Sequence, residues 1–241
     1  MDVILALIMV AFGAFSLALG ITHIGLEDKH VPANWYLLFL GLSNFIWVLG
    51  MAIFTLQISP EGAAFWRSIY LIGIFGSFVS ADLICGVWLK VPAKLQRLIG
   101  IYSIVGALIS YPLLRVPEAC IFIRTEYGMS YSPQRFPGME IYIIYLAGNA
   151  LIMGTEAIYC LIKHRRKRET VMALSCILVL VLLGLSLMLH TYSSNQDTPA
   201  FPSSVIIHSI NVIFIYIMSR KTKINNITLQ NLADYIYASV S

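Results

Sequence analysis

The stretch KHRRKR, from Lys163 to Arg168, is the densest block of charge in this sequence, and apolar runs flank it on both sides. Five of its six residues are lysine or arginine. Short cytoplasmic loops of multi-span membrane proteins carry such an excess of positive charge. The stretch therefore predicts a cytoplasmic loop, and it sets the expected orientation of every helix around it.

Composition places the whole chain in a membrane. Apolar residues make up 59% of the 241 residues and charged residues 12%, whereas a soluble domain has about 25% charged residues. A transmembrane helix needs about 20 apolar residues, so the apolar runs account for nearly all of the chain. The net charge of +4 comes from residues at the ends of these runs, which determine topology. We therefore expect no nucleic-acid partner.

The apolar runs predict an all-α membrane protein, a seven-transmembrane helix bundle. The expected helices cover about 3–25, 33–56, 65–89, 98–114, 138–162, 170–190 and 202–219. Residues 59–62 and 90–97 contain turn formers and are expected to separate helices. Between the fourth and fifth helices, residues 119–125 alternate in polarity, and Tyr127 and Gly128 follow as a turn. This pattern predicts a small outer hairpin or lid.

The distribution of positive charge supports one orientation. With the block at 163–168 inside, twelve of the sixteen lysine and arginine residues lie on the inner side. The predicted N-terminus is therefore outside and the C-terminus cytoplasmic. Residues 1–221 form the expected membrane domain. In residues 222–241, apolar residues recur at helical spacing, which predicts a cytoplasmic amphipathic signalling helix or linker.

Polar residues inside the spans are the candidates for function, because they usually face the bundle interior or a wet cavity. In the fifth expected helix they fall on one stripe. Two interpretations stay open: the stripe holds the bundle together through interhelical hydrogen bonds, or its outer part lines a ligand pocket. The stripe consists of Tyr142, Tyr145, Asn149, Glu156 and Tyr159.

Other helices offer polar residues that we expect to join this stripe around one outward-facing cavity. A tryptophan or tyrosine near a span end can also be a simple interfacial anchor. The candidate ligand-binding residues are Asn44, Trp47, Arg67, Tyr70, Tyr142, Tyr145, Asn149, His208 and Asn211.

Two carboxyl groups, those of Asp82 and Glu156, fall well inside the spans at similar expected depth. No lysine or arginine lies deep enough to pair with them, so we expect at least one to be neutral or bonded to backbone or hydroxyl groups. Both are candidates for a switch or for proton sensing. The histidines and cysteines are scattered, and no nucleophile cluster is evident, so we expect no metal, cofactor or enzymatic activity.

Three absences narrow the class of membrane protein. The seventh expected helix has no mid-span lysine for a retinal Schiff base. The inner end of the third, Gly86 to Lys90, lacks the acidic and arginine pair of animal G-protein-coupled receptors. Residues of helices one to three do not recur in helices five to seven, which counts against a transporter built from repeats.

Several short motifs together resemble the N-terminal seven-transmembrane sensor region of bacterial histidine kinases and diguanylate cyclases. They are the stretch 44–47, the stretch 65–73, Pro137 and Gly138 with Tyr142 and Tyr145, and the tail after Arg220. The resemblance covers essentially the whole chain.

The resemblance implies a receptor in a bacterial plasma membrane that binds a small molecule or lipid from the outer side. It would relay a signal through the C-terminal helix to a cytoplasmic kinase or cyclase domain absent from this chain, in a homodimer embedded among membrane lipids. The alternative is a seven-helix transporter or proton-coupled carrier that uses Asp82 and Glu156.

Overall fold

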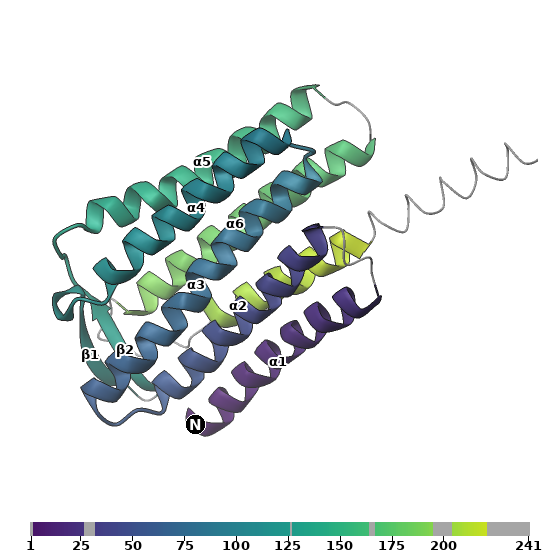
Figure 1. The fold of residues 1–241 in the computed structure, drawn as a ribbon. Helices are drawn as coiled ribbons and strands as arrows, with labels where there is room; N and C mark the ends of the chain where they lie inside the picture. The colour runs from purple at the N-terminus through teal and green to yellow at the C-terminus, as the bar shows by residue number, and fades with distance from the viewer. Residues whose placement is uncertain (1, 27–31, 126, 164–166, 195–203, 221–241) are drawn as a thin grey trace, which may run out of the picture.

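The computed structural model describes residues 2–26, 32–125, 127–163, 167–194 and 204–220, and these form a helical bundle with one small hairpin (Figure 1). The helices are α1 (Asp2–Leu26), α2 (Pro32–Thr55), α3 (Pro60–Trp88), α4 (Ala93–Leu114), α5 (Met139–Lys163), α6 (Lys167–Ser194) and a shorter helix, Ser204–Arg220. A 3-10 turn, η1 (Pro117–Ala119), leads into the strands β1 (Cys120–Thr125) and β2 (Gly128–Pro133).

The helices have the length and surface of a multi-pass membrane protein. Six of them are long and apolar enough to cross a bilayer, while Ser204–Arg220 is apolar but shorter. Large apolar side chains also cover the outside of the bundle: Leu7, Ile144 and Leu151 are each more than 60% exposed. Such a surface suits hydrocarbon rather than water. The count of seven spans and their orientation stay predictions.

Two helices begin earlier than expected. Residues 59–62 were expected as a turn, but they form the start of α3: the Gly62 N–H donates to Ser59 Oγ over 3.1 Å, and Pro60 occupies the first turn. Ser and Pro favour both this cap and a separate turn, so the pattern alone was ambiguous. Likewise α4 begins at Ala93 rather than at 98. A tight turn at Lys90, with φ of 55°, connects α3 to α4.

The first five helices follow one another across the bundle, whereas the Ser204–Arg220 helix returns to lie beside α1 and α2. Figure 1 shows α4 and α5 together along one side of the bundle and α1 along the opposite side, with the remaining helices between them. Small residues let α2 and α3 approach closely: the backbone of Trp47 leaves no room for a Cβ on Gly73. This crossing places the middle of α2 directly against the middle of α3.

The predicted hairpin is confirmed. β1 and β2 pair antiparallel, with Cys120 opposite Pro133 and Thr125 opposite Gly128, whose φ of 106° suits glycine. Tyr131 points from β2 into the core, where its ring centroid lies 6.2 Å from that of Phe54 on α2. The hairpin therefore covers the ends of α2 and α3, and we call this the hairpin end of the bundle.

The Ser204–Arg220 helix is attached to α1 and α2 near the opposite end. The Tyr216 hydroxyl donates to the Leu37 carbonyl and lies where neither Gly20 nor Gly41 has room for a Cβ. Nearby, His23 and Asn34 form a hydrogen bond of 3.0 Å between α1 and α2. The predicted signalling helix at 222–241 lies outside the described residues.

Candidate functional site

The polar residues expected to line one cavity fall into separate groups along α3. From the hairpin end, the first group surrounds Arg67, the second lies where α2, α3 and the Ser204–Arg220 helix meet, and the third surrounds Asp82. A sequence stripe gives depth and face, but it does not specify which neighbouring helix a side chain meets.

Arg67 holds the hairpin end together. Its side chain is buried, Nη1 donates to the Leu114 carbonyl at the end of α4, and its guanidinium carbon lies 5.0 Å from the centre of the Tyr131 ring. Tyr70, one turn further along α3, packs edge-on against Phe54 with 5.6 Å between ring centroids. Arg67 and Tyr70 therefore connect α3 to α4, α2 and the hairpin, beneath the lid.

Burial favours the neutral form of two hairpin side chains, Tyr131 and Cys120. Burial raises the pKa of the Tyr131 phenol, although the neighbouring Arg67 guanidinium acts in the opposite direction. Burial also raises the pKa of the Cys120 thiol, again against the effect of Arg67. Arg67 is therefore the charged group of this cluster.

The second group centres on a contact between Trp47 and His208. Their ring centroids lie 4.2 Å apart with the planes inclined at 42°, and both side chains are buried. Within the described part of the chain, both ring nitrogens of His208 lack a hydrogen-bond partner. The same holds for the indole Nε1 of Trp47. Buried polar atoms of proteins nearly always have partners, so such a group calls for an explanation.

Asn44 positions this group. Its Nδ2 donates to Ser16 Oγ of α1 over 2.9 Å and to Ser209 Oγ, next to His208, over 3.4 Å. Asn44 Oδ1 has no partner among the described residues, and the same holds for Ser77 Oγ, one turn beyond Gly73 on α3. We call Asn44, Trp47, Ser77 and His208 the Trp47–His208 centre.

The centre combines unused hydrogen-bonding capacity of both kinds. Trp47 Nε1 can only donate a hydrogen bond, and Asn44 Oδ1 can only accept one. A neutral imidazole donates at one ring nitrogen and accepts at the other. Each unsatisfied buried group costs about 1–3 kcal/mol. A small polar molecule or water that met several of these groups would recover that free energy, whereas an ion would find no charged partner in the centre.

The third group is a hydrogen-bonded chain across α3, α4 and α5. Ser103 Oγ lies 2.6 Å from Asp82 Oδ2 and 2.8 Å from Asn149 Oδ1, and Asn149 Nδ2 donates to the Tyr145 carbonyl over 2.8 Å. All three side chains are buried. As the sequence indicated, a hydroxyl rather than a cation pairs with Asp82.

The number of protons determines how this chain is connected. A serine hydroxyl has one proton to donate, and both of its neighbours here are oxygens. If Asp82 is protonated, it donates to Ser103, which donates to Asn149, and every contact has one donor and one acceptor. If Asp82 is ionised, two acceptors compete for the Ser103 proton and one is left unmatched, at a cost. Donor counting therefore favours a neutral Asp82.

Of the remaining candidates, Asn211 lies one turn beyond His208 on the Ser204–Arg220 helix, while Tyr142 and Tyr145 belong to α5. Tyr142 packs near Phe75, with 6.3 Å between ring centroids. Asn211 Nδ2 donates to the Val179 carbonyl of α6 over 3.3 Å, while its Oδ1 has no partner among the described residues. Tyr145 faces α4, and Tyr159, from the same predicted stripe, is 57% exposed. The α5 stripe therefore meets several different surroundings.

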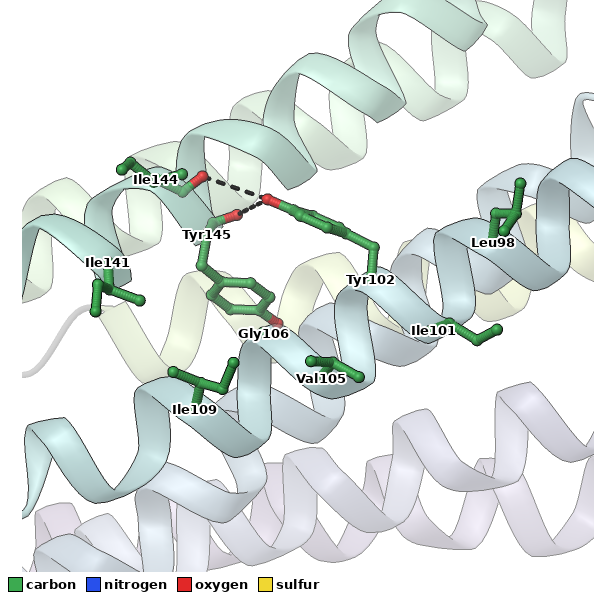
Figure 2. Close-up of a pocket in the computed structure, with 9 residues that line it drawn as sticks. All are labelled: Leu98, Ile101, Tyr102, Val105, Gly106, Ile109, Ile141, Ile144 and Tyr145. Carbon is green, nitrogen blue, oxygen red and sulfur yellow. Dashed lines mark hydrogen bonds between the residues drawn. The ribbon is translucent and has the colours of Figure 1, made fainter.

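Glu156 lies in a groove between α4 and α5 rather than in the bundle interior. Two such grooves occur, and Figure 2 shows the one nearer the hairpin end, with Tyr102 reaching across to α5. Within the described residues, no three histidine, cysteine, aspartate or glutamate side chains are arranged to hold a metal ion.

Sequence reasoning missed Ser16, Ser103 and Ser209. Serines inside apolar spans commonly bond to their own helix, as Ser80 does to the Gly76 carbonyl, so their position carries little signal. Ser103 could have been found only by assuming that α4 packs beside α3 and that Ser103 lies at the same depth as Asp82.

The fold and these buried groups define a multi-pass helical membrane protein with a polar centre. No protein-family model matches the sequence, and no curated protein matches it either. Any narrower function must therefore be argued from the geometry of the buried polar groups.

Proposed function

We infer that this chain is the sensor module of a receptor in a bacterial plasma membrane, and that it binds a small polar molecule at the Trp47–His208 centre. The observation that carries this proposal is the pair of unpartnered nitrogens of His208 against the unpartnered Nε1 of Trp47. Receptor sites in bundles are built from side chains on facing helices. Here α2, α3 and the Ser204–Arg220 helix supply them.

The hairpin fits the role of a lid on the outer side. It covers the ends of α2 and α3, and the buried Arg67 binds the α4 carbonyl end beneath it. A ligand arriving from outside would pass this cluster before it reached His208. The expected outer position of the hairpin follows from the charge distribution.

The Ser204–Arg220 helix supplies a route for the signal. It carries His208 in the centre and Tyr216 near its other end, where the hydroxyl is bonded to the Leu37 carbonyl. A ligand that binds the two positions of this helix with different affinity shifts their populations. Typical coupling free energies are about 1–3 kcal/mol. The helix ends at Arg220, where the chain leads to residues 221–241 and, in our proposal, to a cytoplasmic kinase or cyclase domain in a homodimer.

A thermal-shift screen of small polar compounds tests the proposal. A true ligand should raise the melting temperature of the wild-type protein and of Trp35→Phe, because Trp35 is an exposed residue of the same helix. It should not stabilise Trp47→Phe, which lacks the indole donor. A ligand that stabilises all three proteins equally would place the site elsewhere.

A proton-coupled carrier is the second candidate, because Asp82 and Glu156 are carboxyl groups within helices long and apolar enough to span a membrane. It predicts substrate flux into liposomes that Glu156→Gln abolishes. The sensor predicts no flux. The liposome flux assay therefore distinguishes the carrier from the sensor.

A further inference from the structure

Two apolar grooves lie end to end between α4 and α5. The one nearer the hairpin has a volume of about 370 Å³ and the other about 480 Å³. Leu98 and Tyr102 line both, so the two grooves form one track along the surface of the bundle. Nearly all other lining side chains are aliphatic, and Figure 2 shows those of the groove nearer the hairpin end, which come from both helices. A track of this kind suits an acyl chain.

Paired tyrosine and glycine contacts build this track. Tyr102 of α4 lies against Gly148 of α5, and Tyr145 of α5 lies against Gly106 of α4, with no room for a Cβ on either glycine. The Tyr102 hydroxyl donates toward the Ile144 and Tyr145 carbonyls, each at 3.3 Å. The spacing of α4 and α5 is therefore fixed by specific contacts.

Glu156 lies at the end of the track that is farther from the hairpin. Its carboxyl borders the larger groove together with Thr155 and Leu95, and Oε1 is buried without a hydrogen-bond partner in the described residues. An acidic group facing hydrocarbon is costly unless it is paired. A cationic hydrogen-bond donor in a ligand that fills this groove would offset that cost.

Lys94 lies beside the same end. It is exposed and precedes Leu95, which lines the groove opposite Glu156, and it lies one turn from Leu98. A lysine at the end of an interhelical groove is a partner for lipid phosphate. The groove thus offers one acceptor for a cation and, next to it, one cation for an anion.

We propose that the α4–α5 groove binds a phospholipid with a primary amine in its headgroup. The ammonium pairs with the Glu156 carboxyl group where it borders the groove, the phosphate binds Lys94, and one acyl chain follows the track past Tyr102. A choline headgroup has the same charge but no N–H to donate, and a glycerol headgroup has no cation. The arrangement therefore selects phosphatidylethanolamine over phosphatidylcholine and phosphatidylglycerol. This site is separate from the Trp47–His208 centre.

Native mass spectrometry of the protein released from nanodiscs tests this proposal. The discs contain equal amounts of phosphatidylethanolamine, phosphatidylcholine and phosphatidylglycerol with identical acyl chains. Wild-type protein should retain phosphatidylethanolamine over each competitor by about tenfold, the ratio expected for one charge-assisted hydrogen bond. Glu156→Gln should lose this preference. Glu140→Gln, an exposed residue at the other end of α5, should keep it.

A second variant tests the acyl-chain track without touching the carboxyl. Leu98→Trp should fill the junction of the two grooves, and its exposed position allows the fold to be kept, as its melting temperature would show. Retention of all three lipids should fall in this variant. The proposal is overturned if phosphatidylcholine is retained as well as phosphatidylethanolamine, if Glu156→Gln keeps the preference, or if folded Leu98→Trp retains lipid like the wild type.

Discussion

The imidazole of His208 lies against the indole of Trp47, with ring centroids 4.2 Å apart, in the buried middle of the bundle. Aromatic stacking explains the contact between the two rings. It does not explain why their nitrogens are buried without hydrogen-bond partners in the described part of the chain. Three ring nitrogens stay without partners among the described residues, which is the arrangement of a site that is completed by something else.

Replacing His208 by Phe tests whether the centre is built for binding or for stability. The aromatic contact with Trp47 should survive, while two unsatisfied nitrogens disappear, so the free energy of unfolding should rise by about 1–3 kcal/mol. The response to ligand should be lost. Thermal unfolding in detergent and a ligand dose response measure the two effects. Loss of stability in His208→Phe would mean that the nitrogens are satisfied.

Asp82→Asn tests the proton count in the α3–α4–α5 chain. An asparagine amide can donate to Ser103 as a protonated carboxyl does, so the free energy of unfolding of this variant should be close to that of the wild type. Ser103→Ala removes the link between Asp82 and Asn149 and should cost about 1–3 kcal/mol. Infrared spectroscopy should show a protonated carboxyl band that Asp82→Asn lacks. Equal destabilisation by both variants would indicate an ionised Asp82.

Arg67→Gln should loosen the hairpin. The change removes the guanidinium from the Leu114 carbonyl and from the Tyr131 ring, and should cost about 2–3 kcal/mol. Limited proteolysis should then cleave within the hairpin faster than in the wild type. Arg135→Gln is the matched control, because its ion pair with Glu140 is exposed and worth little. Equal cleavage of both variants would show that Arg67 does not hold the hairpin in place.

Cys120 should react slowly with thiol reagents. Burial raises the pKa of its thiol, and the thiolate is the reactive form. In native protein, alkylation of Cys120 should therefore require a higher pH than in the unfolded chain. Mass spectrometry of the Cys120 peptide after short labelling pulses across pH measures this difference. Coincident pH profiles for the native and unfolded states would contradict a buried Cys120.

The sequence was sufficient for the helices and the hairpin, because apolar runs and the Tyr127–Gly128 turn are local signals. It predicted that Asn44 and Trp47 of one helix lie near His208 of another, and the fold brings Trp47 and His208 together. It did not separate them from Arg67 or from Asn149, because depth in a span says nothing about which helix lies opposite. The start of α3 at Pro60 was missed because Ser59 and Pro60 suit a cap and a turn equally well.

The most direct measurement is native mass spectrometry of the protein purified in mild detergent, with chemical identification of any small molecule that stays bound. The sensor account predicts a polar compound that wild-type protein and Trp35→Phe retain and that His208→Phe loses while it stays folded. A compound retained equally by His208→Phe, or wild-type protein that retains no such compound and transports substrate into liposomes, would contradict it.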